Sequence, residues 1–298
     1  MKILTDRVSL KTHYTIELHL RREDLIHPII SGNKFRKLKY NLEEAKKLGF
    51  STLLTFGGAY SNHIAATAYA GEQSGFKTIG VIRGEELIDK VEGNPTLRFA
   101  KKNGMTFHFV SREEYRRKGE REFLNLLQNR FGEFYMLPEG GTNALAVKGC
   151  EEILKKEDSV YDFICCPVGT GGTISGIINS AHHHQRVLGF PALKGDFIRN
   201  DIRKFAQQKN WDIITDYHFG GYGKINADLI SFINRFKAKY GIPLDPIYTG
   251  KMMYGIFDLM AKDFFPKESK ILAIHTGGLQ GIEGMNIRLK QKNLPLID

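Results

Sequence analysis

Two lysines near the start of an amphipathic stretch are the side chains best suited to covalent chemistry. Lys34 and Lys37 lie three positions apart within residues 32–40, so they share one face of the helix that this stretch predicts. Burial and a neighbouring cation both lower the pKa of an amine and make it a nucleophile at neutral pH. One lysine could therefore be the nucleophile and the other the partner of an anion, although such basic clusters also occur on solvated helix surfaces.

A glycine-rich turn supplies a site for an anion. Residues 168–173 pass from an apolar strand into a helix, and they include Thr170, Gly171, Gly172 and Thr173. Backbone N–H groups at such a helix N-terminus bind anions, and the threonine hydroxyls add donors. No lysine follows as in a P-loop, and Ile174 replaces the third glycine of a dinucleotide motif. We predict a phosphate site that does not serve a nucleotide, with a ligand-free turn as the alternative.

Glycines also follow the predicted strands at residues 56–63 and 275–278, and another apolar run breaks into glycine at residues 219–223. Open parallel sheets bind their ligands beyond the carboxyl ends of the strands, so we expect these turns to line one site. The turn at 138–143 either lines the same site or only caps the helix that begins near Asn143. A reactive lysine and a phosphate site without a nucleotide motif together suggest a phosphorylated aldehyde cofactor held as a Schiff base.

Short apolar runs alternate with amphipathic stretches, which is typical of parallel sheets covered by helices. The predicted strands are residues 52–56, 78–82, 106–110, 134–137, 163–168, 186–190 and 271–275. The predicted helices are residues 62–73, 94–102, 113–130, 144–156, 174–182 and 227–240. The fold class is therefore α/β. Because no linker separates two halves, we predict a small inserted α/β domain at 54–134 and a large domain from 1–53 and 135–298.

Composition limits the class of protein and its location. The 298 residues are 42% hydrophobic and 26% charged, and no apolar run reaches the ~20 residues of a membrane-spanning helix. The net charge is +10, but the basic residues are interleaved with acidic ones along the chain, and this distribution favours a small anionic ligand. The charge leaves a nucleic-acid-binding protein that retains the fold as an alternative. Cys150, Cys165 and Cys166 are expected to be buried thiols, and with no signal peptide we expect a cytoplasmic location. The histidines at 182–184 point in different directions and predict no metal site.

Six segments resemble motifs of the pyridoxal-phosphate-dependent family of D-cysteine desulfhydrase and 1-aminocyclopropane-1-carboxylate (ACC) deaminase. They are REDL (22–25), GNKFRKLKY (32–40), GGAYSNH (57–63), TGGT (170–173), DPIYTGK (245–251) and HTGG (275–278). Six matches in order over nearly the whole chain are far more specific than any one of them. The resemblance implies two interleaved open parallel-sheet domains like those of the tryptophan synthase β-subunit (fold type II), the cofactor pyridoxal 5′-phosphate and a homodimer.

The resemblance also implies which residues hold the cofactor. Lys34 would form the Schiff base, and Lys37 would join residues 170–173 at the phosphate. Asn62 would hydrogen-bond the ring oxygen, and Thr249 would face the pyridine nitrogen.

A second set of residues would meet a small amino-acid substrate, and it consists of Ser61, Asn62, His63, Thr276, Tyr222 and Tyr248. The first three begin a predicted helix, so their backbone donors would bind the substrate carboxylate. Tyr222 and Tyr248 resemble the two active-site tyrosines of the family. Lys34 is the first candidate for the base that removes the α-proton, with Ser61 or a tyrosine as alternates.

Two positions distinguish the activities within the family. Thr249 and Thr276 stand where ACC deaminases carry Glu and Leu. A hydroxyl is a weaker proton partner than a carboxylate, so the ring would withdraw electrons less strongly. We therefore predict a lyase that converts D-cysteine, or a related small D-amino acid, to pyruvate, ammonia and sulfide. Deamination of ACC to 2-oxobutyrate and ammonia is the alternative.

Overall fold

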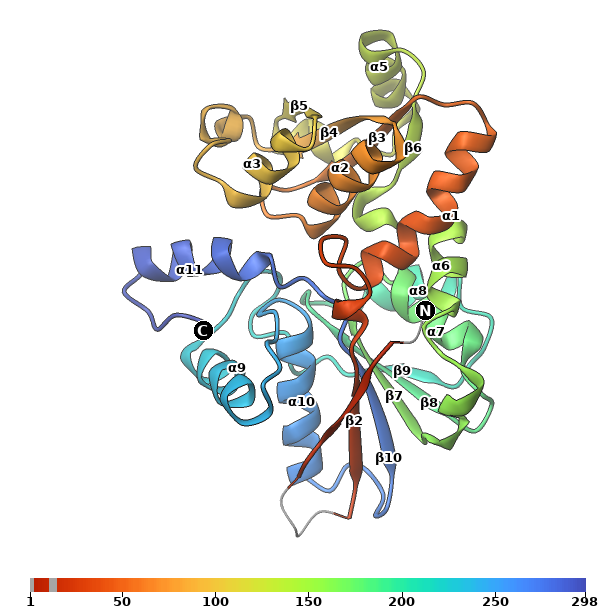
Figure 1. Ribbon diagram of the computed structural model, residues 1–298, viewed down its shortest axis with the longest axis vertical. Helices are drawn as coiled ribbons and strands as arrows, with labels where there is room; N and C mark the ends of the chain where they lie inside the picture. Colours follow the sequence, from red (N-terminus) through yellow and green to blue (C-terminus); the bar gives the residue numbers. More distant parts are fainter. Residues whose placement is uncertain (1–2, 11–14) are drawn as a thin grey trace.

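Two β-sheets, one above the other in Figure 1, form the framework of the computed structural model, which describes residues 3–10 and 15–298. The larger sheet has the order β1-β2-β10-β7-β8-β9, and only β1 runs antiparallel to its neighbour. The smaller sheet has the order β5-β4-β3-β6 and is parallel. The strands of the larger sheet are β1 (Thr5–Val8), β2 (Glu17–Arg21), β7 (Phe163–Val168), β8 (Arg186–Pro191), β9 (Trp211–Ile213) and β10 (Lys270–Ile274). Those of the smaller sheet are β3 (Thr52–Gly57), β4 (Lys77–Arg83), β5 (Met105–Val110) and β6 (Tyr135–Leu137).

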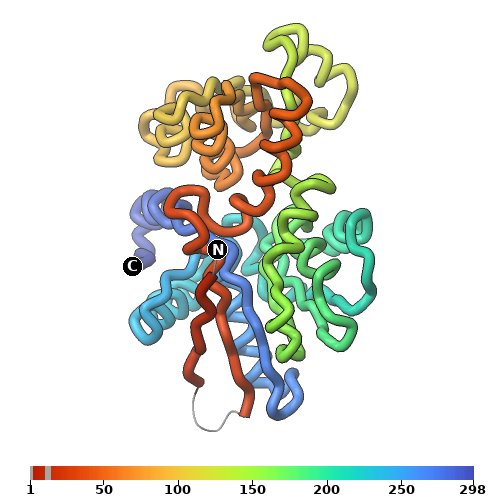
Figure 2. Tube along the Cα trace, turned by 45° about the vertical axis from the view of Figure 1, so that its right-hand side comes forward, coloured from red at the N-terminus to blue at the C-terminus, as the bar shows by residue number. Residues whose placement is uncertain are grey.

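The helices lie on both faces of the two sheets, and the predicted α/β class is confirmed. They are α1 (Asn33–Lys47), α2 (Asn62–Ser74), α3 (Pro95–Lys102), α4 (Arg112–Arg116), α5 (Arg121–Phe131), α6 (Ala144–Glu151), α7 (Gly172–Ser180), α8 (Ile198–Arg203), α9 (Ala227–Tyr240), α10 (Thr249–Ala261) and α11 (Gly281–Gln291). Figure 2 shows the N-terminal strands beside β10, with which β2 pairs although the two are far apart in sequence.

The larger sheet separates two hydrophobic cores, and strand β7 contributes to both. Cys165 packs in the core that contains Met252 of α10. Cys166 packs in the core on the other face, with Ile174 of α7. Because successive strand residues point to opposite faces, these adjacent thiols lie in different cores. Their predicted burial is confirmed, and burial raises the pKa of both.

Successive residues of a strand in the smaller sheet also pack in two different cores. Leu53 of β3 packs with Leu38 of α1 and Ala66 of α2 on one face. The next residue, Leu54, packs with Phe123 of α5 on the other face. Helix α1 thus belongs to the core of the smaller sheet, although it precedes that sheet in the chain.

The smaller sheet extends slightly beyond the predicted insertion at 54–134. Strand β3 begins at Thr52, and β6 occupies Tyr135–Leu137. The division into an inserted domain at 54–134 and a large domain from 1–53 and 135–298 stays a prediction, and residues 1–2 lie outside the described residues.

Two predicted helices end earlier than expected. The stretch 113–130 forms two helices, α4 and α5, because the segment with Gly119 interrupts it and Glu120 is extended. The stretch 144–156 leaves the helix after Glu151, and the next apolar residues, Ile153 and Leu154, are buried in the core beside α7. In the first case a glycine interrupts the helical periodicity, and in the second the tertiary packing of apolar side chains overrides it.

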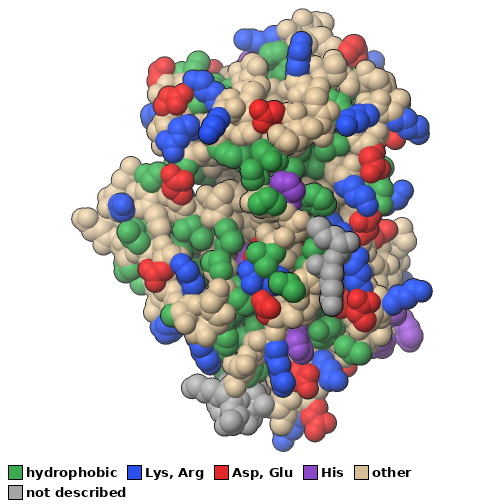
Figure 3. Space-filling model, in the orientation of Figure 1, with side chains coloured by type: hydrophobic (Ala, Val, Ile, Leu, Met, Phe, Trp, Pro, Cys, Tyr) green, Lys and Arg blue, Asp and Glu red, His purple; other side chains and the backbone are tan. Residues whose placement is uncertain are grey.

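The surface agrees with the expectation of solvated helix faces. On the face seen in Figure 3, Lys and Arg side chains are interspersed with Asp and Glu and do not gather into one basic patch. Within the described ranges, no helix combines the length and apolar character needed to cross a membrane.

Candidate active site

The strand-end turns of both sheets meet at one cleft of about 980 Å³. The turns after β3, β6, β7 and β10 line it, together with the loop that carries Tyr222. All of the predicted site residues contribute to its lining except Gly172 and Thr249. Each of these two directly follows a lining residue in the chain, Gly171 and Tyr248 respectively. The topology therefore brings together residues from most of the length of the sequence.

Lys37 places a positive charge beside the glycine turn. Its Nζ donates hydrogen bonds to the carbonyl oxygen of Gly140 at 2.9 Å, to Oγ1 of Thr142 at 3.0 Å and to Oγ1 of Thr170 at 3.4 Å. The two threonine hydroxyls are themselves 2.6 Å apart. Burial lowers the pKa of Lys37. An anion at the turn would therefore meet both an ammonium group and hydroxyl donors.

The turn at residues 170–173 requires glycine at two positions. Gly171 precedes helix α7 with φ of +84°, a left-handed conformation that favours glycine. A Cβ on Gly172 would lie 2.8 Å from Oγ1 of Thr142, so a side chain would displace that threonine. The first N–H groups of α7 have no intrahelical partner and are free to bind an anion.

Lys34 is connected to the same turn through Asn33. Its Nζ donates to Oδ1 of Asn33 at 3.0 Å, and Nδ2 of Asn33 donates to Oγ1 of Thr173 at 2.8 Å. Burial and, to a smaller extent, the charge of Lys37 lower the pKa of Lys34 to about 7. A large fraction of this amine is therefore unprotonated at neutral pH. Lys37 already donates to three oxygens, so the contacts favour Lys34 as the nucleophile.

The N-terminus of α2 forms a second set of backbone donors. Ser61 caps the helix, since its Oγ accepts a hydrogen bond from the N–H of Ile64 at 3.3 Å. The N–H groups of Asn62 and His63, in the first turn, have no partner within the helix. Oδ1 of Asn62 is buried and has no hydrogen-bond partner in the described part of the chain. These groups line the cleft. The N–H groups can bind a carboxylate, and Oδ1 of Asn62 can accept a hydrogen bond from a ligand.

The ring of His63 is a structural group. Its Nε2 lies 2.8 Å from Oγ1 of Thr55 in the strand below the helix. Burial, and then the charges of Lys34 and Lys37, hold the pKa of His63 well below its usual value. The imidazole is therefore neutral, and its Nδ1 is buried without a hydrogen-bond partner in the described part of the chain; the expected role of the His63 backbone N–H stays a prediction.

Thr249 is a buried hydroxyl at the start of α10. It is 0% exposed, and its Oγ1 has no hydrogen-bond partner among the residues described. Its backbone N–H donates to Oδ2 of Asp245 at 2.8 Å, while Oδ1 of Asp245 accepts the N–H of Tyr248 at 2.7 Å. The capping carboxylate fixes the backbone of this turn, and the hydroxyl of Thr249 is left for another partner.

Tyr222 and Tyr248 lie beside each other in the lining of the cleft. Their ring centroids are 6.2 Å apart with an interplanar angle of 64°. Tyr248 packs against Gly169, where a Cβ would lie 3.1 Å from the ring. Burial raises the pKa of Tyr248 well above its usual value, so this phenol stays protonated and can donate a hydrogen bond.

Lys251 holds the loop that carries Tyr222. Its buried Nζ donates to the carbonyl oxygens of His218 and Gly221, both at 2.9 Å. The loop contains a left-handed non-glycine residue, Phe219, with φ of 53°. Burial lowers the pKa of Lys251 to about 8, and the negative charge of Asp245 opposes this shift. Helix α10 therefore supports both tyrosines, one directly and one through this lysine.

The turn after β10 brings Thr276 against the start of α1. The carbonyl oxygen of Thr276 accepts the N–H of Asn33 at 3.1 Å, and a side chain at Gly32 would clash with that oxygen. A Cβ on Gly278 would lie 2.8 Å from Nδ2 of Asn62. Thr276 thus lines the cleft, two residues before the glycine that approaches Asn62, and its role toward the substrate stays a prediction.

Sequence reasoning missed the roles of Asn33, Thr142 and Lys251. Asn33 and Lys251 lie inside the segments that carry the family resemblance, so only their contacts were absent from the prediction. The turn at 138–143 combines its two alternatives: Asn143 caps α6 by accepting the N–H of Ala146 at 2.9 Å, while Thr142 contacts Lys37.

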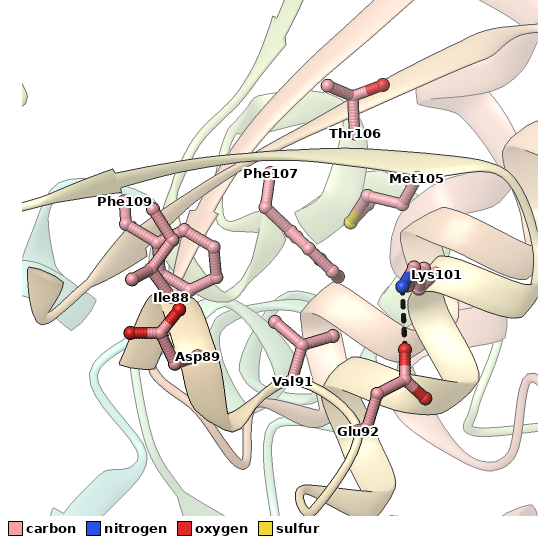
Figure 4. A pocket seen from close by; sticks show the side chains of 9 residues that line it. All are labelled: Ile88, Asp89, Val91, Glu92, Lys101, Met105, Thr106, Phe107 and Phe109. Atoms are coloured by element: carbon pink, nitrogen blue, oxygen red, sulfur yellow. Dashed lines mark hydrogen bonds and ion pairs between the residues drawn. The ribbon is translucent and has the colours of Figure 1, made fainter. Parts of the chain in front are cut away.

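A separate hollow of about 410 Å³ lies beside the edge strand β5. Figure 4 shows the rings of Phe107 and Phe109 there with Val91, and the ion pair of Lys101 with Glu92 at 2.6 Å. It contains neither a glycine turn nor an unpaired amine, so the chemistry belongs to the cleft.

Comparison with known proteins agrees with this geometry. The sequence pattern of the family described as "Pyridoxal-phosphate dependent enzyme" matches residues 5–277. A Thermotoga maritima protein, provisionally named a 1-aminocyclopropane-1-carboxylate deaminase, is 32% identical over 303 residues, which cover 94% of each chain. The mitochondrial bifunctional D-cysteine desulfhydrase/1-aminocyclopropane-1-carboxylate deaminase of Arabidopsis thaliana is 30% identical over 89% of this chain and 73% of its own. The crystal structure of an ACC deaminase homologue, 28% identical, gives a TM-score of 0.80 over 92% of this chain and 88% of that one.

Proposed function

Because the chain belongs to the family of pyridoxal-phosphate-dependent enzymes, we propose that it catalyses β-elimination of D-cysteine, or of a related small D-amino acid, to pyruvate, ammonia and sulfide. The predicted fold type II and the predicted cofactor are confirmed. Membership of a family of enzymes favours catalysis over the nucleic-acid-binding alternative, which was based on the net charge of +10. The substrate and the roles of individual residues are part of the proposal.

The cleft suits pyridoxal phosphate in three respects. The glycine turn at 170–173, with the Lys37 ammonium beside it, suits a phosphate dianion. The partly neutral amine of Lys34 suits an aldehyde. The buried, unpartnered oxygens of Asn62 and Thr249 require polar partners, which the ring oxygen and ring nitrogen of the cofactor would supply.

The cofactor, when bound, supplies a ring that withdraws electrons from the α-carbon of the substrate. The residues of the chain then have three tasks. The first-turn N–H groups of α2 bind and orient the substrate carboxylate. The amine of Lys34, with a pKa near neutrality, accepts the proton from the α-carbon. The protonated phenol of Tyr248 donates a hydrogen bond to the departing sulfur, and Tyr222 covers the same side of the cleft.

The observation that carries the choice of reaction is the buried hydroxyl of Thr249. No carboxylate lies at this position, so a proton on the ring nitrogen would lack a negative partner there, and the ring would withdraw electrons only moderately. Expulsion of sulfide requires weaker electron withdrawal by the cofactor ring than opening of a carbon–carbon bond does. Deamination of ACC is nevertheless the second candidate, because the Thermotoga maritima relative carries that provisional name.

A substrate panel tests the proposal. The holoenzyme is incubated with D-cysteine, L-cysteine and ACC, while sulfide, pyruvate and 2-oxobutyrate are measured. We expect sulfide and pyruvate from D-cysteine, little from L-cysteine and no 2-oxobutyrate from ACC. Faster turnover of ACC than of D-cysteine would reverse the choice between the two candidates. The homodimer and the cytoplasmic location stay predictions of the sequence.

A further inference from the structure

Two arginines at the mouth of the cleft have no acidic partner. Arg83 ends strand β4, and Arg288 lies on α11; both line the cleft. Neither forms an ion pair with any carboxylate in residues 3–10 and 15–298. Other basic side chains at the mouth are neutralised: Arg112 contacts Glu86 at 2.8 Å, and Lys118 contacts Glu139 at 3.3 Å.

Arg83 faces the turn that leads into the carboxylate-binding end of α2. Its Nη2 lies 3.4 Å from the position that a Cβ on Gly58 would take. Its guanidinium carbon lies 5.5 Å from the centre of the Tyr115 ring, which supports one side of the group and leaves its in-plane donors for a ligand. Arg83 is an exposed side chain on the lining of the cleft, so a ligand can reach this guanidinium.

Arg288 approaches from the larger sheet. Its Nη1 lies 3.5 Å from the position that a Cβ on Gly223 would take, next to Tyr222 in the chain. One arginine therefore flanks the turn after β3 and the other flanks the loop of Tyr222. The phosphate has its own donors in Lys37 and the turn at 170–173, so its binding does not call on either arginine.

From these contacts we propose that the substrate carries a second negative charge, at the end of its β-substituent, and that Arg83 is the main residue that binds it. The α-carboxylate already has donors in the first turn of α2, so it does not account for a free arginine beyond them. The ligand class is a cysteine S-substituted with a short chain that ends in a carboxylate. This inference rests on the proposed β-elimination and specifies its substrate.

The reaction of such a substrate balances without a further reagent. The Cα–H bond breaks and its proton passes to Lys34, while the Cβ–S bond breaks and the sulfur leaves as a thiolate with the bonding electron pair. The resulting 2-aminoacrylate takes up water and yields pyruvate and ammonia. For S-carboxymethyl-D-cysteine the third product is mercaptoacetate.

A matched pair of ligands tests the role of the charge. S-carboxymethyl-D-cysteine and S-carbamoylmethyl-D-cysteine have nearly the same shape but differ by one negative charge. For the holoenzyme, we measure the dissociation constant of each from the change in cofactor absorbance, and kcat/KM from pyruvate release. We expect the charged compound to be favoured roughly tenfold in both quantities, as for one charge-assisted contact at a partly exposed site.

Variants assign the preference to a residue. Arg83→Met retains the packing on Tyr115 and should abolish the preference, whereas Arg83→Lys should retain part of it. Arg130→Met, which removes an exposed arginine that does not line the cleft, should leave the preference unchanged. Equal weakening of both compounds in Arg83→Met would show that Arg83 binds the α-carboxylate, and equal binding of both by the unmodified enzyme would also overturn the inference.

The same experiment keeps the two proposals apart. Turnover of D-cysteine without a preference for the charged compound would contradict only the second anionic site. Tight, Arg83-dependent binding of the charged compound without release of pyruvate would support the site and contradict the proposed β-elimination.

Discussion

The ammonium group of Lys251 lies 2.9 Å from the carbonyl oxygen of Gly221, and through this contact helix α10 holds the loop of Tyr222. A second hydrogen bond of the same length, to the carbonyl oxygen of His218, fixes the other side of the loop. Tyr248 and Lys251, which holds the loop of Tyr222, thus both lie in the first turn of α10. The two tyrosines are therefore placed relative to each other by one helix N-terminus.

Replacement of Lys251 by Ala should therefore impair the enzyme through Tyr222. The buried carbonyl groups of His218 and Gly221 would lose their donor, at a cost of about 1–3 kcal/mol each. We expect kcat to fall more than KM rises, and n-propylammonium, which replaces the missing atoms, to restore part of the activity. Failure of any alkylammonium ion to rescue a folded variant would show that Lys251 does not act through these carbonyl groups.

Lys34 should be the residue that holds the cofactor covalently. Reduction of the holoenzyme with borohydride followed by peptide mapping should place the phosphopyridoxyl label on Lys34. Lys34→Ala should lose the label but retain its fold and some non-covalent cofactor. A label on Lys37 or Lys251, which are also buried amines, would contradict the assignment.

The amine of Lys34 should titrate close to neutral pH in the apoenzyme. Burial and the charge of Lys37 lower its pKa to about 7, so the amine is protonated below that pH and nucleophilic above it. Reductive methylation with ¹³C-formaldehyde and NMR titration measure this directly, with Lys34→Arg as the assignment control. In Lys37→Met the titration should move to higher pH, because a neighbouring positive charge is removed. An unchanged midpoint in Lys37→Met would mean that burial alone sets the pKa.

Thr170→Val should weaken cofactor binding. The change removes a hydroxyl donor beside the expected phosphate, and one charge-assisted hydrogen bond contributes about 1.5–3 kcal/mol. The dissociation constant of pyridoxal phosphate for the apoenzyme should rise by roughly one to two orders of magnitude. Thr106→Val, an exposed position on β5, is the matched control. Equal affinities of the two variants would remove this turn from the phosphate site.

Exchange of two threonines should shift the balance between the candidate reactions. Thr249→Glu with Thr276→Leu gives the ring nitrogen an acidic partner, which stabilises its proton and makes the ring a stronger electron sink. We expect 2-oxobutyrate from ACC to rise and sulfide from D-cysteine to fall, each by roughly tenfold, a change of about 1.4 kcal/mol in barrier. Thr249→Glu alone should show part of the effect. No gain of ACC turnover in a folded double variant would contradict the explanation of Thr249.

Patterns local in sequence predicted much of the framework. The strand-end glycines mark the cleft because left-handed turns and close approaches at Gly171 and Gly278 exclude side chains, and this requirement is visible in the residue type. Strands β1, β2 and β9 were missed. The four and three residues of β1 and β9 carry too little periodicity to predict a strand, and β2 has only five residues.

Contacts between distant segments could not be predicted in this way. The pairing of Lys37 with Thr142 and Thr170 joins positions more than a hundred residues apart, and it depends on how the two sheets are placed. Arg83 reads as an ordinary strand-end arginine in the sequence. Its significance comes from its place on the lining of the cleft without an ion pair in the described chain, which only the tertiary structure shows.

The position of two adjacent thiols on opposite faces of β7 makes them independent reporters of local opening. Cys165 is covered by α9 and α10, whereas Cys166 is covered by α7, and both are fully buried. A thiol reagent can reach either one only when its own layer of helices lifts away. The labelling rates of single-cysteine variants would therefore measure, one face at a time, how often each layer separates from the sheet, and whether pyridoxal phosphate slows that separation on both faces or only on the side of α7.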